Sequence, residues 1–207
     1  MIFLSPLLLA ISSNLETLSV SLSYGIKKIY LPKSTMILFS VLTSISVFIS
    51  MHIGKLFIPL FGFQLADIFG AILLCFIGIS SIVEYVKIEK KRTGYDTSYF
   101  YENPFGYKNI LDNPIVVDAD KSNHIDMKEC LTLCLAISLS NSLTFFAGSL
   151  TGININLSSF LYFLISIISI CLGSYYSKWL SFRLLKKYSY LISGVILIFL
   201  GILESFI

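Results

Sequence analysis

Long apolar stretches, separated by shorter polar segments, follow one another along the chain. Six of them reach the length of about 20 mostly apolar residues that a transmembrane helix needs. They cover approximately residues 3–24, 35–58, 66–87, 130–150, 157–177 and 188–206. The first has no basic residue before it and no small-residue cleavage site after it, so we expect a span rather than a removable signal peptide. The pattern predicts an all-α integral membrane protein with six transmembrane helices.

The composition agrees with this class. Of the 207 residues, 56% are hydrophobic and 13% are charged, whereas a soluble domain is about 45–50% apolar and about 25% charged. These values argue against a disordered chain, a secreted disulfide scaffold and an ordinary cytosolic enzyme. The cysteines lack the spacing of a zinc site or a disulfide framework. They are Cys75, Cys130, Cys134 and Cys171.

The basic residues are distributed very unevenly between the two sides of the predicted membrane. Fourteen of the 15 Lys and Arg residues follow the first, third or fifth span, and the exception is Lys55. Loops rich in Lys and Arg stay on the cytoplasmic side of a membrane. We therefore expect an N-out and C-out protein, with the segment 88–129 as its largest cytoplasmic loop.

The two halves of the chain resemble each other weakly. Similar segments occur in the same order: 9–26 with 135–153, 50–54 with 169–173, and 68–70 with 192–194. Because each half has three spans, the halves would enter the membrane in opposite directions, as in many transporters. We expect two inverted three-helix repeats, 1–87 and 130–207. The alternative is that small-residue spacings recur wherever membrane helices pack closely.

Polar side chains mark the first and fourth spans. Glu16 lies near the middle of the first, and an ionised carboxylate there costs about 2.5–3.5 kcal/mol, so it should face the bundle interior. The candidate residues of a transport path are Ser12, Glu16, Ser138, Ser140, Asn141 and Ser142. Their oxygen atoms suit a hard divalent cation. The alternative is a serine-lined packing face with a protonated Glu16.

The end of the cytoplasmic loop carries a more specific pattern. Residues 118–129 fit D-x-D-x-S-x-x-I-x-x-x-E, the twelve-residue calcium loop of an EF-hand. The candidate metal ligands are Asp118, Asp120, Ser122, Asp126 and Glu129. The sixth position, usually Gly, is Asn123, which tolerates a left-handed backbone better than most residues. The alternative is a capping box in which Asp126 and Glu129 begin a helix, and both can hold together.

Three segments resemble the YtaF-like sporulation membrane proteins: 16–29 (ETLSVSLSYGIKKI), 113–142 (NPIVVDADKSNHIDMKECLTLCLAISLSNS) and 193–204 (SGVILIFLGILE). That family is related to the MntP-like manganese exporters of the lysine-exporter-like superfamily. The resemblance implies six spans, duplicated halves and one Asp in each of the first and fourth spans. These acids correspond to Glu16 and to Ser140, so the second carboxylate is replaced here. The resemblance also implies a multi-pass protein of the bacterial plasma or forespore membrane.

Two functions therefore remain open from the sequence. One is a cation transporter, such as a manganese-like exporter, and the other is a non-transporting spore-membrane protein whose loop binds a cation or a protein partner. No nucleophile–base pair is evident, so we expect neither an enzyme nor catalytic residues. A divalent cation, Mn²⁺ or Ca²⁺, is the one cofactor we consider. We expect the protein to contact the lipid bilayer and not nucleic acid. Whether it forms a homo-oligomer stays open.

Overall fold

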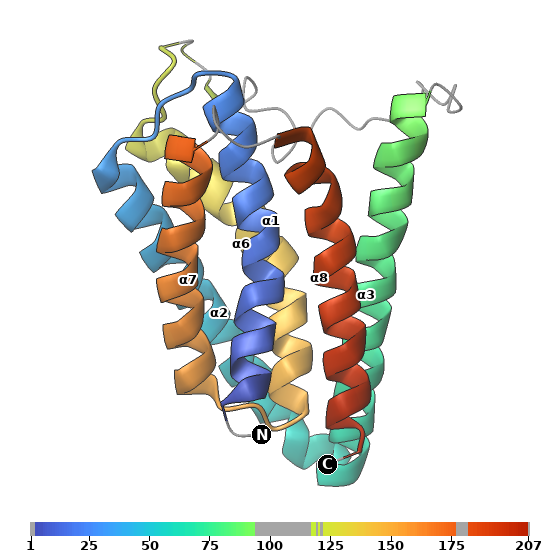
Figure 1. The fold of residues 1–207 in the computed structure, drawn as a ribbon. Helices are drawn as coiled ribbons and strands as arrows, with labels where there is room; N and C mark the ends of the chain where they lie inside the picture. The colour runs from blue at the N-terminus through green and yellow to red at the C-terminus, as the bar shows by residue number, and fades with distance from the viewer. Residues whose placement is uncertain (1–2, 94–116, 119, 121, 177–181, 207) are drawn as a thin grey trace.

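Six long helices make up the described part of the protein (Figure 1). The computed structural model describes residues 3–93, 117–118, 120, 122–176 and 182–206, so most of the predicted cytoplasmic loop lies outside the described residues. The helices are α1 (Leu4–Ile26), α2 (Lys33–Phe61), α3 (Phe63–Thr93), α6 (Met127–Leu150), α7 (Ile155–Tyr176) and α8 (Phe182–Glu204). The all-α class and the six helices are confirmed. The main differences are that α3 continues six residues beyond its predicted end at residue 87 and that α8 begins six residues before its predicted start at residue 188.

Four of these helices are long and apolar enough to cross a membrane: α2, residues 63–87 of α3, α6 and α7. In α8 the apolar part is shorter and covers Tyr188–Glu204. Large apolar side chains lie exposed on the outside of the bundle, such as Leu60, Leu65 and Leu135. Contiguous exposed apolar surface is unusual for a soluble monomer. The chain is therefore a membrane protein, with lipid as the natural neighbour of this surface.

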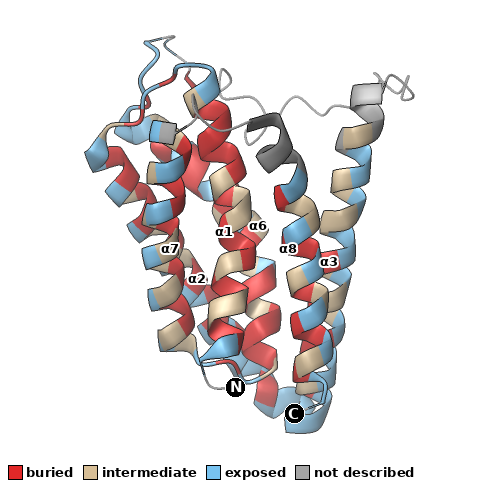
Figure 2. Ribbon diagram, in the orientation of Figure 1, coloured by how far each residue is buried: buried red, intermediate tan, exposed pale blue. Residues whose placement is uncertain are grey.

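Helix α1 is polar because so much of it is buried inside the bundle rather than turned to lipid. Its buried residues include Ser12, Asn14 and Thr17 in addition to apolar ones (Figure 2). Some of its buried hydroxyls find partners on the backbone, as when the Ser12 hydroxyl donates to the carbonyl of Leu9 at 3.0 Å. The polar pattern of this helix thus reflects its central position.

The helices pack in three close pairs: α1 along α7, α2 along α6 and α3 along α8. Small residues allow these close approaches, as is usual between membrane helices. In α3, a Cβ atom added at Gly78 would lie 2.7 Å from the carbonyl oxygen of Gly194 in α8. Similarly, Gly54 of α2 faces Ser149 of α6, and Gly173 of α7 faces Ser21 of α1.

The described part of the predicted cytoplasmic loop lies at the end of the bundle opposite the two chain ends (Figure 1). It docks on the connection between α1 and α2. The backbone N–H of Tyr30 donates to the carbonyl of Asn123 at 2.8 Å, and that of Ile125 donates to the carbonyl of Tyr30 at 3.1 Å. Ile125 is fully buried in a cluster with Tyr24 and Val117. The loop is therefore anchored to the helices by both backbone pairing and apolar burial.

Candidate functional site

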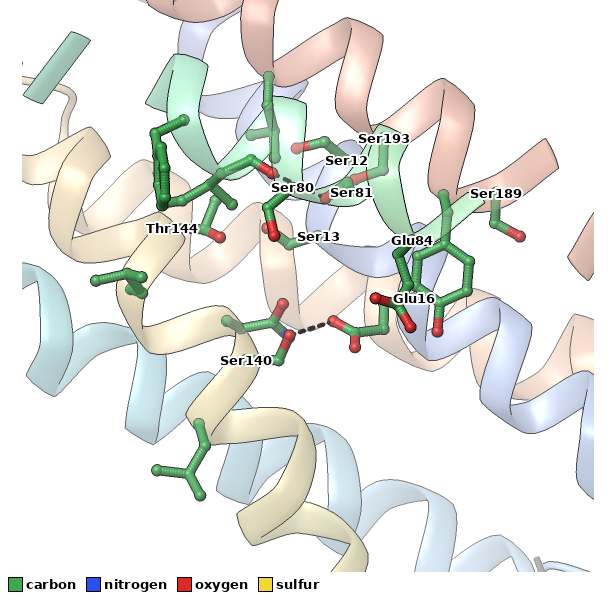
Figure 3. A pocket seen from close by; sticks show the side chains of 17 residues that line it. Ser12, Ser13, Glu16, Ser80, Ser81, Glu84, Ser140, Thr144, Ser189 and Ser193 are labelled. Carbon is green, nitrogen blue, oxygen red and sulfur yellow. Dashed lines mark hydrogen bonds between the residues drawn. The ribbon is translucent and has the colours of Figure 1, made fainter. Parts of the chain in front are cut away.

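A polar cavity of about 210 Å³, partly open to the outside of the bundle, lies between α1, α3, α6 and α8 (Figure 3). Each of these helices contributes residues from near its own middle, so the cavity is central along the bundle. The polar side chains that line it are Ser12, Ser13, Glu16, Ser80, Ser81, Glu84, Ser140, Asn141, Thr144, Ser189, Tyr190 and Ser193. Such a lining of hydroxyls and carboxylates can hold a hydrated or partly hydrated cation.

Glu16 and Ser140 meet directly in this cavity. The Ser140 hydroxyl donates a hydrogen bond of 2.7 Å to Oε2 of Glu16 (Figure 3). A hydrogen bond to a carboxylate is among the stronger ones in proteins, and it also orients the acceptor. The two positions that the family resemblance assigns to acids are thus adjacent, although here one of them is a hydroxyl donor.

A second carboxylate in the cavity comes from Glu84 of α3, which the sequence analysis missed. Figure 3 shows Glu84 and Glu16 directed into the same space. Ser80 and Ser81 precede Glu84 by four and three residues, so all three lie on one face of α3. That spacing, inside the predicted span 66–87, was the available signal. The loss of an acid at Ser140 therefore does not leave the cavity with a single carboxylate.

Ser138 and Ser142, which the prediction grouped with the transport path, lie outside this lining. The Ser142 hydroxyl donates to the carbonyl of Ser138 at 2.6 Å. The carbonyl of Ser142 in turn accepts a hydrogen bond from Ser50 of α2. Successive residues of a helix are about 100° apart, so a polar stripe from 138 to 142 covers more than one face. Ser142 thus takes part in the α2–α6 contact, and the hydrogen bond that Ser138 accepts lies within α6.

Two buried amides, of which Asn141 lines the cavity, join α1 and α6 to Tyr162 of α7. Asn141 donates from Nδ2 to the hydroxyl of Tyr162 at 2.8 Å, and Asn14 donates from Nδ2 to the carbonyl of Tyr162 at 3.3 Å. Within the described part of the chain, Ser13 Oγ has no hydrogen-bond partner although it is buried. Because Ser13 lines the cavity, the space is suited to polar contents, which would satisfy such a group.

A separate carboxylate cluster lies at the loop end of the bundle. Asp118, Asp120 and Glu129 each place one carboxylate oxygen within 4.8 Å of the others. Asp118 is buried and accepts hydrogen bonds from the backbone N–H groups of Ser122 and Asn123, at 3.0 and 3.1 Å. Asn123 has φ 59°, the left-handed conformation expected at the sixth position. Three of the five predicted ligands therefore come together.

The other two predicted ligands, Ser122 and Asp126, make hydrogen bonds within the loop and at the start of α6. Ser122 donates from its hydroxyl to the carbonyl of His124 at 3.0 Å, and its hydrogen bonds hold the pKa of Asp120 below its ordinary value. Asp126 lies outside the carboxylate cluster. It is the N-cap of α6, and its backbone N–H donates to Glu129 Oε2 at 3.1 Å in a capping box. The predicted capping arrangement is therefore present beside the cluster.

Comparison with known proteins identifies a distant relative. The chain is 24% identical over 212 aligned residues to a Bacillus subtilis (strain 168) protein described as "Probable sporulation protein YtaF". The alignment covers 96% of this chain and 97% of the relative, which supports the resemblance to the YtaF-like proteins. No protein-family model and no solved structure matches the chain significantly.

Proposed function

We propose that the chain is a multi-pass membrane protein of the YtaF-like sporulation family that moves a divalent cation, manganese-like in its chemistry, through the central cavity. The observation that carries this proposal is the presence of Glu16 and Glu84 in one hydroxyl-lined cavity of the bundle. Ionisable residues inside a membrane are expensive and typically mark ion paths. Oxygen-only donors favour hard cations such as Mg²⁺, Ca²⁺ and Mn²⁺.

The packing of the helices supports an inverted repeat of six spans. Helices α1 and α6 run in opposite directions along the bundle (Figure 1). The inverted repeat would relate α1 to α6, α2 to α7 and α3 to α8. Under this correspondence the α1–α7 contact is equivalent to the α6–α2 contact, and the α3–α8 contact is equivalent to itself. The Gly54–Ser149 and Gly173–Ser21 contacts are exchanged in the same way. In transporters of this design the binding site lies where the repeats meet, near the membrane midplane.

An apolar layer borders the cavity on the side of the chain ends. It consists of Leu9, Leu74, Leu197 and Leu200, each at most 2% exposed and all in one packed cluster. With the N-out and C-out orientation that the basic loops favour, this layer would face the outside. A cation leaving the cavity in that direction requires the layer to open, as alternating access demands.

Flux into vesicles tests the proposal. The purified protein, reconstituted into liposomes with a divalent-cation-sensitive dye inside, should carry Mn²⁺ faster than protein-free liposomes. Ca²⁺, Mg²⁺ and Co²⁺ on the same vesicles define selectivity. Folded, reconstituted protein that carries none of these cations would contradict transport and favour the alternative of a non-transporting spore-membrane protein.

A further inference from the structure

The loop end of the bundle carries a second group of carboxylates that the proposed transport does not use. Asp118 and Asp120 come from the segment before α6, and Glu129 comes from the first turn of that helix. We propose that these three side chains form a divalent-cation site, separate from the membrane cavity. This proposal does not depend on whether the protein transports a cation.

An independent observation at Tyr24 points to a ligand in this place. The Tyr24 side chain is fully buried and packs with Val117, Ile125 and Cys130. Its hydroxyl has no hydrogen-bond partner among the described residues. The cluster in which it is buried includes Val117 and Cys130, which are the chain neighbours of Asp118 and Glu129. A buried hydroxyl without a partner is unfavourable. A water molecule held by a cation at the cluster would supply that partner, because such sites commonly retain water ligands.

The loop is already closed around its first carboxylate. Two backbone N–H groups, those of Ser122 and Asn123, donate to Asp118. The pairing of Ile125 with Tyr30 fixes the following residues on the bundle. As a result the first and twelfth positions of the loop, Asp118 and Glu129, lie side by side. A site ordered in advance loses less conformational entropy on binding.

The donor set defines the class of cation. All three clustered side chains offer carboxylate oxygen, and the loop adds the backbone carbonyl of His124 near the same turn. Oxygen donors of this kind suit Ca²⁺ or Mn²⁺ and disfavour soft metals that select thiolate or imidazole. Ca²⁺ accepts six to eight ligands in flexible geometry, so water molecules can complete its shell.

Calorimetric titration of the purified full-length protein, first stripped with a chelator, tests this site with Ca²⁺ and Mn²⁺ separately. The wild type should show one saturable site for at least one of the two ions. The same site should be present in Glu16→Gln, so that failure of the proposed transport would leave this binding unchanged. Asp120→Asn, at an exposed position, and Asp118→Asn should each weaken binding about tenfold or more.

Asp126→Asn is the matched control. It removes the same charge from the same loop, but Asp126 lies outside the cluster and Asn also caps helices well, so the affinity should change less than about threefold. Unaltered thermal unfolding of each variant without cation shows that the fold is retained. The proposal is overturned if the wild type binds neither ion at millimolar concentration. Equal affinity of the wild type and Asp120→Asn would also overturn it.

Discussion

The central cavity and the loop cluster both gather carboxylates, yet they are assembled in opposite ways. Glu16 and Glu84 come from α1 and α3, and side chains of α6 and α8 complete the cavity around them. Asp118, Asp120 and Glu129 come from twelve consecutive residues. The first group exists only when four helices pack, whereas the second needs a short loop and the first turn of one helix. Chemistry of the same kind can therefore be specified by tertiary or by local structure.

The hydrogen-bond donors differ as well. In the cavity, Glu16 accepts from the side-chain hydroxyl of Ser140, while at the loop Asp118 accepts from two backbone N–H groups. The loop also lies at the end of the bundle, where Asp120 is exposed. A carboxylate at mid-bundle is costly to ionise, so a cation there is held against a larger desolvation penalty. We infer that the loop cluster is suited to holding a cation stably, whereas the cavity is suited to letting a cation pass.

The largest expected effect is at Glu16. Glu16→Gln keeps a hydrogen-bond acceptor for Ser140 but removes the charge, and cation flux into liposomes should fall about a hundredfold, or about 2.7 kcal/mol in the barrier. Glu89→Gln, on α3 but outside the cavity lining, is the charge-matched control and should stay near wild type. Equal cation flux in the wild type and Glu16→Gln would show that Glu16 is not part of the transport path.

Gly78→Val should affect the central cavity, which depends on helix packing, but not the loop cluster, which is built from local structure. The new side chain meets the backbone of Gly194 and the side chain of Ile198 in α8, and overpacking of this kind costs about 2 kcal/mol. Thermal unfolding followed by circular dichroism should shift to lower temperature and cation flux should fall, while the loop keeps its affinity. Ile79→Ala, at a lipid-facing position that is 53% exposed, should leave unfolding nearly unchanged. If the cation affinity of the loop cluster also fell in Gly78→Val, the loop would not be independent of the helix packing.

Glu84→Gln tests whether α3 supplies the carboxylate that the Ser140 position lacks. Flux should fall about tenfold, which is about 1.4 kcal/mol, and less than in Glu16→Gln because Glu16 keeps its bond to Ser140. The same liposome assay measures it. If Glu84→Gln transports as well as the wild type, Glu84 contributes only to the polarity of the cavity.

The smallest effect is expected at the N-cap of α6. Asp126→Ala removes the capping side chain and should lower the free energy of unfolding by about 1 kcal/mol. Asp126→Asn should lower it by no more than a few tenths of a kcal/mol. Chemical unfolding in detergent measures both. A large loss of cation affinity in Asp126→Asn would instead show that this residue is a ligand as well as a cap.

The two regions also differ in how far the sequence analysis reached. The helices followed from apolar length, and the gathering of Asp118, Asp120 and Glu129 followed from their spacing, because both depend on neighbouring residues. Glu84 was missed because only the first and fourth spans were considered for polar side chains inside the membrane. Ser138 and Ser142 were grouped with Ser140 because a stripe in sequence does not reveal which neighbour each face of a helix meets.

The amino-acid sequence by itself determined the six helices, the uneven placement of basic residues and the left-handed turn at Asn123. These follow from apolar length, charge and backbone preference, all of which are local properties. Only the tertiary structure decided that Glu84 joins Glu16 and that Tyr24 packs with Val117 and Ile125 of the loop. Such contacts join residues far apart in the chain, and they depend on which helix faces pack together.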